Sequence, residues 1–147
     1  MAMSTLTRCI EVDAFQALID RELPLCAMFG IRIEEIEYGS AKMRMHFNPS
    51  QIRPGGTVAG PALMTLADVT LYAVVLGMIG PVELAVTTSL NINFLRKPPQ
   101  HDIIAEGRIL KLGKRLAIGE VFLHSEGLDE PVAHVTGTYS IPPRTSV

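Results

Sequence analysis

The sequence predicts an α+β domain in which a curved antiparallel sheet of about six strands wraps around one long central helix. The first observation behind this is a long apolar run, residues 61–79, that contains a single charged residue, Asp68. The second is a period-two alternation of apolar and polar residues on both sides of that run, which is typical of half-buried strands. The third is that these strands follow one another without further helices, so the strand–helix alternation of a parallel sheet is absent.

The N-terminal segment is expected to be helical over about residues 4–24. Apolar side chains recur there at helical spacing: Phe15, Leu18, Ile19 and Leu23. Ser4 or Asp13 is a candidate N-cap, and Pro24 is expected to end the helix.

Two strands are expected before the apolar run and four after it. They cover residues 31–38, 41–47, 88–94, 103–111, 116–124 and 132–141. The segment 41–47 carries the clearest pattern, because four apolar residues alternate strictly with Lys42, Arg44 and His46. Gly39 and Gly113 mark turns between successive strands.

The apolar run is expected to be a helix buried inside the protein. Pro61 suits the first helical position, and Gly80 followed by Pro81 ends the pattern. The run is long enough to cross a membrane, but a carboxylate near its middle would cost about 2.5–3.5 kcal/mol there. Since one sheet covers only about half of such a helix, a second protomer is expected to cover the rest. The sequence therefore predicts a homodimer, or a dimer of dimers, and no membrane.

Composition limits the remaining classes of function. A chain of 147 residues is expected to form one domain, with its core over about residues 30–142. A net charge of −2 argues against nucleic acid as a partner. Cys9 and Cys26 have no metal-binding spacing, which favours reduced thiols in the cytoplasm. No secretory signal opens the chain, and no metal, dinucleotide or nucleotide-hydrolysis motif occurs.

Asp68 is the residue on which chemistry depends most. A buried carboxylate is costly unless it is hydrogen-bonded or reaches water. Either it satisfies neighbouring groups such as Thr65 or Thr70, or it is a catalytic base or nucleophile at a subunit boundary. Gly60, at the start of the same helix, has a backbone N–H suited to an oxyanion, and its alternative role is a hinge at the helix entry. The spacing suggests that Asp68 and this first turn share one helix face.

Two basic clusters lie at predicted strand ends. They consist of Arg96 with Lys97, and of Lys111, Lys114 and Arg115, of which Lys114 and Arg115 are the candidate substrate-binding residues. They are either ordinary solvated turns or groups that bind the phosphates of a carrier such as coenzyme A (CoA).

Residues 53–71, RPGGTVAGPALMTLADVTL, resemble the active-site region of hotdog-fold acyl-CoA thioesterases of the PaaI-like type. The later stretches TTSLNINFLRKPP and GRILKLGKRLAIGEVFL resemble strands of the same family. The resemblance implies a hotdog fold, with Asp68 as general base or nucleophile and the Gly60 N–H polarising the thioester carbonyl. It also implies that Thr87, from the partner subunit, orients the attacking water. The chain departs from the family pattern at three positions, with Arg53 for Asn, Ala59 for His and Pro61 for the second Gly.

Taken together, these features predict hydrolysis of an acyl-CoA thioester, with CoA as part of the substrate and no further cofactor. Met64, Leu71 and Tyr72 are expected to shape the acyl pocket. Arg53 is expected to neutralise the carboxylate of Asp68, to bind the carrier phosphate or a substrate carboxylate, or to block the pocket. The alternative is a hotdog protein that binds acyl-CoA or acyl-carrier thioesters without cleaving them. A purely structural oligomer and a hydratase rank lower, the hydratase because no histidine follows Asp68 at the required spacing.

Overall fold

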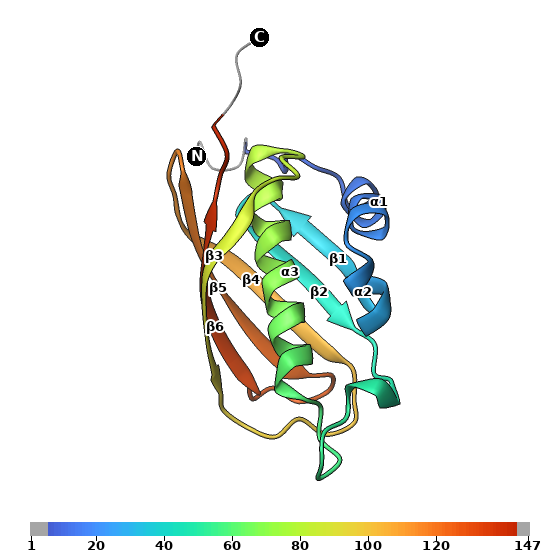
Figure 1. The fold of residues 1–147 in the computed structure, drawn as a ribbon. Coiled ribbons are helices and arrows are strands. Elements are labelled where there is room, and N and C mark those ends of the chain that lie inside the picture. The colour runs from blue at the N-terminus through green and yellow to red at the C-terminus, as the bar shows by residue number, and fades with distance from the viewer. Residues whose placement is uncertain (1–5, 144–147) are drawn as a thin grey trace.

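The computed structural model describes residues 6–143, which form one six-stranded antiparallel sheet wrapped around a long helix (Figure 1). The helices are α1 (Val12–Glu22), α2 (Pro24–Phe29) and α3 (Gly60–Ile79), with a 3₁₀ turn at Pro49–Gln51. The strands are β1 (Ile31–Glu37), β2 (Ser40–Met45), β3 (Val86–Phe94), β4 (Ile103–Leu112), β5 (Leu116–Ser125) and β6 (Ala133–Ser140). The predicted hotdog architecture is confirmed.

The strands are arranged in the order β1-β2-β4-β5-β6-β3, so β1 and β3 are the two edges. Every ladder is antiparallel. β3 follows α3 in the chain and pairs with β6, the last strand, rather than with β4. This order brings the start of β3 and the end of β6 together beside the middle of α3 (Figure 1).

The long helix lies close to the sheet because glycines on two central strands leave room for it. A Cβ added at Gly119 or at Gly137 would come within 2.7 or 2.6 Å of the Leu71 side chain. Such distances are shorter than atomic contacts allow, so an alanine at either position would push α3 away from β5 and β6. These two glycines therefore set how tightly the sheet wraps around the helix.

Within one protomer, α3 is not buried on every side. Twelve of its twenty residues are buried, most of them toward the sheet. Partly exposed residues recur at helical spacing along the other side, at Pro61, Met64, Thr65, Asp68 and Tyr72. We call these five residues the open stripe. The helix is long and apolar enough to cross a membrane, but about two thirds of its most apolar window is buried within the fold.

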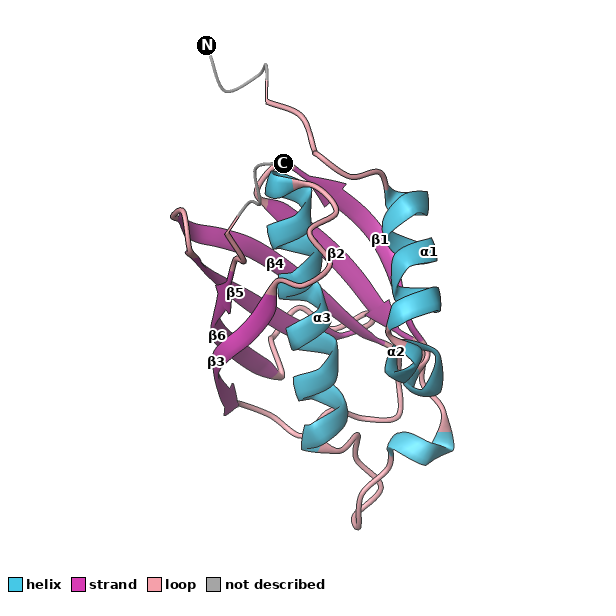
Figure 2. Cartoon of the chain, turned by 45° about the horizontal axis from the view of Figure 1, so that its top comes forward, coloured by secondary structure: helices cyan, strands magenta, loops and turns pink. Residues whose placement is uncertain are grey.

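α1 and α2 lie beside α3 over the β1 end of the sheet (Figure 2). Phe15 and Ile19 of α1 are fully buried, and the Ile33 N–H of β1 donates to the Gln16 side chain over 3.0 Å. Covering an edge strand in this way protects it from pairing with another chain. No element among residues 6–143 pairs with the outer edge of β3, the opposite edge.

The predicted N-terminal helix differs in detail. Glu11, not Asp13, is the N-cap of α1, and Ser4 lies outside the described residues. Pro24 follows the end of α1 as expected, yet it also begins the short helix α2, because proline is tolerated in the first turn. Cys9 and Cys26 are both free.

Candidate active site

Asp68 lies in the middle of α3 on the open stripe, half-buried, and its carboxylate is held by two hydroxyl groups. Thr87 Oγ1 donates to Asp68 Oδ1 over 2.5 Å. The Tyr139 hydroxyl donates to the same oxygen over 2.8 Å and also lies 2.8 Å from the Asp68 carbonyl oxygen. The other carboxylate oxygen, Oδ2, has no hydrogen-bond partner among residues 6–143, and it is not among the buried unpaired atoms. Oδ2 is therefore the oxygen available to a ligand.

The sheet register brings the two hydroxyls together. Thr87 and Tyr139 are directly opposite each other in the β3–β6 ladder. An irregularity in the ladder follows between Thr87 and Ser89, and such bulges redirect side chains. Thr87 therefore holds the carboxylate of its own chain. The expected role of Thr87 from a partner subunit, in orienting the attacking water, stays a prediction.

The neighbouring threonines of α3 play no part in holding the carboxylate. Thr65 and Thr70 donate to the helix carbonyls of Pro61 and Leu66, over 2.9 and 2.7 Å. Donation to the carbonyl four residues earlier is a common way to satisfy a hydroxyl inside a helix. The expectation that Asp68 pairs with these residues is therefore wrong.

Sequence reasoning missed Tyr139. Its side chain is only 4% exposed, and its ring stacks on that of Tyr72 with centroids 6.1 Å apart. Burial, followed by the nearby charge of Asp68, raises the pKa of the Tyr139 hydroxyl above its ordinary value. The phenol therefore stays protonated and remains a donor. Tyr139 is on an inward-facing position of an alternating strand, but that pattern alone does not show that its hydroxyl reaches the helix.

A cavity of about 450 Å³ opens beside Asp68, between α1, α3 and the segment that connects α3 to β3. Its walls are largely apolar and come from Leu18, Ile19, Leu23, Val69, Tyr72, Leu84, Ala85 and Val86, with Thr87 and Tyr139 next to the carboxylate. Two further carboxylates, Glu22 and Glu83, also line it. Arg21 lies between them, at 3.5 Å from Glu22 and 3.6 Å from Glu83.

The nearby thiol is not a nucleophile. Burial, helped by the charges of Asp20 and Asp68, raises the pKa of Cys26 to about 12. Since the thiolate is the reactive form, Cys26 is inert at neutral pH. Among the described residues, none of the four histidines is hydrogen-bonded to Asp68 either: His46 pairs with Asp102 and His134 with Glu120.

Gly60 begins α3, and its N–H is free. Pro61 has no N–H, and those of Ala62 and Leu63 donate to the Ala59 carbonyl. Among residues 6–143, no group accepts the Gly60 N–H. A Cβ at this position would lie 3.1 Å from the ring of Phe94, so the packing there leaves little room for a side chain.

Gly60 and Asp68 do not meet within one protomer. Eight residues along an α-helix span about 12 Å. A single thioester carbonyl is therefore out of reach of both groups when they come from the same chain. Pro61 of the first turn lies on the same face as Asp68, as expected, but about two turns away along the helix.

The three residues expected around the acyl group have different surroundings. Tyr72 lines the cavity beside Asp68, and its hydroxyl donates to the Glu83 carbonyl over 3.0 Å. Met64 is 38% exposed on the open stripe. Leu71 is buried against the sheet glycines and does not line the cavity.

The two basic clusters lie at opposite ends of the sheet. Arg96 follows β3 and is bound to the segment before β6, through Glu130 at 2.8 Å and the Pro131 carbonyl at 2.6 Å. Lys97 beside it is exposed. Arg53 lies in the loop that precedes α3, where it donates to the Pro54 carbonyl and does not contact Asp68.

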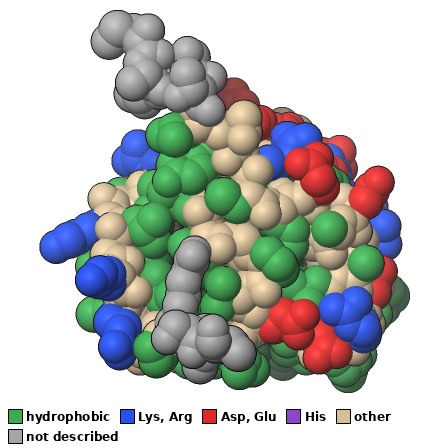
Figure 3. Space-filling model, turned by 90° about the horizontal axis from the view of Figure 1, so that it is seen from above, with side chains coloured by type: hydrophobic (Ala, Val, Ile, Leu, Met, Phe, Trp, Pro, Cys, Tyr) green, Lys and Arg blue, Asp and Glu red, His purple; other side chains and the backbone are tan. Residues whose placement is uncertain are grey.

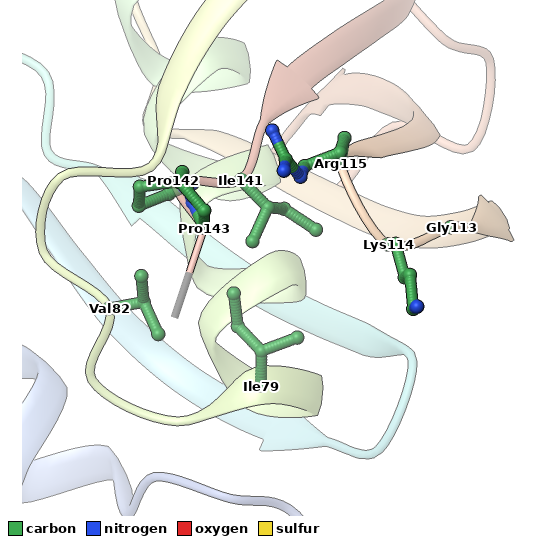
Figure 4. Close-up of a pocket in the computed structure, with 8 residues that line it drawn as sticks. All are labelled: Ile79, Val82, Gly113, Lys114, Arg115, Ile141, Pro142 and Pro143. Atoms are coloured by element: carbon green, nitrogen blue, oxygen red, sulfur yellow. The ribbon is translucent and has the colours of Figure 1, made fainter. Parts of the chain in front are cut away.

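Lys114 and Arg115 belong to the β4–β5 hairpin and border a second cavity, of about 810 Å³ (Figure 4). Its other walls are apolar: Ile79, Val82, Ile141, Pro142 and Pro143. Neither basic side chain forms an ion pair within residues 6–143. Viewed from this end of the molecule, basic side chains gather along one side, acidic and basic side chains mix on the opposite side, and hydrophobic side chains lie between them (Figure 3).

Comparison with known proteins agrees with this architecture. The sequence pattern of the thioesterase superfamily matches residues 55–132. Over 133 residues the chain is 29% identical to a candidate esterase of Saccharolobus solfataricus, covering 90% of this chain and 86% of that protein. A crystal structure of a candidate thioesterase from Silicibacter sp. TM1040 is 41% identical, with a TM-score of 0.84, covering 92% of this chain and 94% of that one.

The resemblance to PaaI is also present in three dimensions. A mutant of the phenylacetic acid degradation protein PaaI from Thermus thermophilus is 25% identical with a TM-score of 0.71, covering 80% of this chain and 97% of that one. The family match spans more than half of the chain, and the fold around α3 agrees with it. The chain therefore belongs to the thioesterase superfamily, hydrolases of thioesters, and has the hotdog fold of its PaaI-like members.

Proposed function

We propose that the protein hydrolyses acyl-CoA thioesters at a site built by two protomers, with Asp68 from one and the Gly60 N–H from the other. The observation that carries this proposal is the carboxylate of Asp68, which lies beside a cavity and keeps one oxygen free. In a hydrolase fold, such a group is placed to act on a bound ester.

The two-protomer arrangement is supported by the distance of about 12 Å along α3 between Gly60 and Asp68. If two copies of α3 pack antiparallel along their open stripes, the first turn of one helix comes opposite the middle of the other. The unpaired outer edge of β3 provides the rest of the interface, since an exposed edge strand readily pairs with a second copy. Large apolar side chains around this edge are exposed: Leu84, Val86, Phe94 and Leu95.

In the proposed reaction, the thioester and water give the free acid and CoA as the carbon–sulfur bond breaks, by either of two routes. As general base, Asp68 Oδ2 takes a proton from the attacking water, and that proton passes to the departing CoA sulfur. As nucleophile, Oδ2 attacks the thioester carbonyl, the carbon–sulfur bond breaks, and CoA leaves as the thiolate from a mixed anhydride with Asp68. Water then hydrolyses the anhydride to the free acid and the Asp68 carboxylate, and the proton released by that water neutralises the thiolate. In both routes the Gly60 N–H of the partner subunit donates to the oxygen on which negative charge develops.

The surroundings of Asp68 support a substrate with an uncharged acyl group. The cavity is lined by apolar side chains and, near its edge, by Glu22 and Glu83. A carboxylate on the acyl chain would be repelled by these groups, and Arg21 offsets only part of their charge. Tyr72 contributes to the wall of this pocket, and Met64 faces the proposed partner.

Basic side chains are proposed to hold the carrier. Lys114 and Arg115 border the larger cavity, where two cations stand beside an apolar wall. This combination suits a phosphate next to a nucleoside. Arg53, Arg96 and Lys97 lie at the other end of the sheet, near the start of α3, and are assigned to the carrier bound at the second site of the dimer.

One observation favours the alternative, a protein that binds acyl thioesters without cleaving them. The ring of Phe94 lies 3.1 Å from where a Cβ of Gly60 would be, so the space beside the proposed oxyanion donor is narrow. Ala59 also offers no polar side chain at this point. In this alternative the cavities bind the thioester, but the Gly60 N–H does not donate to its carbonyl oxygen.

A screen of thiol release separates the two functions. Purified protein is incubated with acyl-CoAs of short, medium, long and aromatic acyl groups, and free CoA is measured with a thiol reagent. Binding of the same esters is measured by calorimetry. Release of CoA that depends on the protein supports hydrolysis. Binding without release supports the alternative, and neither binding nor release contradicts both.

A further inference from the structure

We propose that Tyr139 is a positioning residue, which together with Thr87 fixes the Asp68 carboxylate so that only Oδ2 is presented to the substrate. The inference rests on the proposed hydrolysis, because it assigns a role within that site. It goes beyond the residues expected from the sequence, among which Tyr139 does not appear.

The geometry carries this assignment. The Thr87 and Tyr139 hydroxyls both donate to Oδ1, over 2.5 and 2.8 Å, and neither contacts Oδ2. An ionised carboxylate only accepts hydrogen bonds, and a hydrogen bond to an ionised carboxylate is stronger than one between two neutral groups. Two such donors on one oxygen oppose rotation of the carboxylate. They leave the second oxygen free toward the open stripe.

Tyr139 is the more rigid of the two donors. It lies on β6, which is paired on both sides, opposite Ala117 of β5 and Thr87 of β3. Its ring is 4% exposed and stacks on Tyr72, whose own ring packs against Phe15. Thr87 instead lies on the edge strand, beside the ladder irregularity. A phenol held inside the sheet can therefore keep the carboxylate in place even when the edge strand moves.

A positioning role predicts a specific kinetic signature. Removing the hydroxyl frees the carboxylate to rotate, and small misplacements of a reacting group cost up to about 10²-fold in rate. For Tyr139→Phe we expect kcat to fall about 10- to 100-fold while KM changes little, since Tyr139 touches Asp68 rather than the carrier. The acidic limb of the kcat profile is expected to move to higher pH, because the ionised carboxylate loses a donor.

The direct test compares Tyr139→Phe with Tyr38→Phe, which makes the same change in the turn between β1 and β2. Thermal unfolding of both variants checks that the fold is kept. Loss of kcat and a shifted acidic limb in Tyr139→Phe alone support the proposal. Wild-type kcat and an unshifted limb in Tyr139→Phe would overturn it.

A second measurement needs no turnover and separates failure of this inference from failure of the proposed function. The side-chain carboxyls are labelled with ¹³C, and the Asp68 signal is followed by NMR against pH in the free protein. Other ionisable groups near Asp68 are Glu22, Glu83, Tyr72 and Cys26, and these are unchanged in the variant. If the wild type releases no CoA, an upward shift of the Asp68 midpoint in Tyr139→Phe still supports the positioning role. An unchanged midpoint contradicts it.

If Tyr139→Phe does not fold, 3-fluorotyrosine at position 139 keeps the ring and makes the hydroxyl a stronger donor. The Asp68 midpoint is then expected to move to lower pH, and no movement would overturn the proposal.

Discussion

Thr87 Oγ1 lies 2.5 Å from Asp68 Oδ1, although the two residues are 19 positions apart and belong to an edge strand and to the central helix. This bond joins the start of β3 to the middle of α3 at the point where the cavity opens. It places the candidate catalytic carboxylate at the junction of the helix and the sheet edge proposed to pair with a second protomer. A change in that interface is therefore expected to alter the position of the Asp68 carboxylate through the Thr87 side chain.

Removing the Thr87 hydroxyl is expected to lower both activity and stability. In Thr87→Val the carboxylate loses one of its two donors, so we expect kcat to fall about 10-fold and the free energy of unfolding to fall by about 1 kcal/mol. Thr87→Ser keeps the hydroxyl and is expected to retain most of both. Thr88→Val, one position along the same strand, is the control, since among residues 6–143 the Thr88 hydroxyl donates to the Thr138 carbonyl and to no other group. A loss in Thr87→Ser that Thr87→Val does not show would mean that the methyl group, not the hydroxyl, matters.

The carboxylates beside the cavity are expected to select against acidic acyl groups. For the wild type, kcat/KM should be lower with succinyl-CoA than with butyryl-CoA, which has the same number of carbons. Replacing both carboxylates, in Glu22→Gln/Glu83→Gln, should raise kcat/KM for succinyl-CoA by about 30-fold, since each of the two neighbouring charges has an effect of about 1 kcal/mol. The value for butyryl-CoA should stay within about twofold. An equal change in kcat/KM for both substrates would show that the cavity does not select substrates by their charge.

Mixed dimers test whether one site draws on two protomers. Asp68→Asn removes the carboxylate function, and Gly60→Pro removes the N–H at a helix position that tolerates proline. Ala59, the preceding residue, already has an extended backbone suited to a following proline. Each variant alone should be inactive, whereas a mixed dimer contains one intact site out of two and should recover about half of the wild-type rate per dimer, because the symmetry of the dimer makes its two sites equivalent.

Two tags on the differing chains allow the mixed dimer to be purified before thiol release is measured. The background Phe94→Leu relieves the contact with a side chain at position 60. Absence of recovery in a mixed dimer of confirmed composition would place both groups of each site in one chain.

The outer face of the sheet is expected to lose stability in acid. Glu120 accepts from His134 and is paired with Arg108, and these contacts, His134 first, hold the pKa of Glu120 below its ordinary value. A lowered carboxylate pKa means that the stabilisation is present above the unfolded value, 4.5, and is lost as the pH falls through the folded value. Between pH 5 and pH 3, the melting temperature of the wild type should therefore fall more than that of Glu120→Gln. Both melting temperatures are measured by differential scanning fluorimetry. Parallel falls would contradict this role.

How much could be predicted from the sequence depended on how local each signal was. Strand bounds and the position of α3 followed from periodicity, because the side chains of each element report their own surroundings. Asp68 stood out because it is the single charge in an apolar helix. Tyr139 did not stand out, because its role depends on the register of β3 against β6. That register places Tyr139 opposite Thr87, although the two strands are far apart in the sequence.

Two expectations failed for physical reasons of the same kind. Thr65 and Thr70 were plausible partners of Asp68 on the helix, but their hydroxyls are satisfied by helix carbonyls. Leu71 was expected in the acyl pocket, yet it fills the space left by glycines on the neighbouring strands. In both cases the backbone took the place of the expected partner: helix carbonyls accept from the threonines, and the backbone at sheet glycines packs against Leu71. The identity of these side chains alone does not reveal such contacts.

The most direct test of the central claim is CoA release by Asp68→Asn, measured with the acyl-CoA that the wild type cleaves fastest. The substitution is nearly isosteric, so the variant should keep its melting temperature and its affinity for the ester. We expect kcat to fall about 10²- to 10⁴-fold, the usual effect of removing a general base. Undiminished hydrolysis by a correctly folded Asp68→Asn protein would contradict the account.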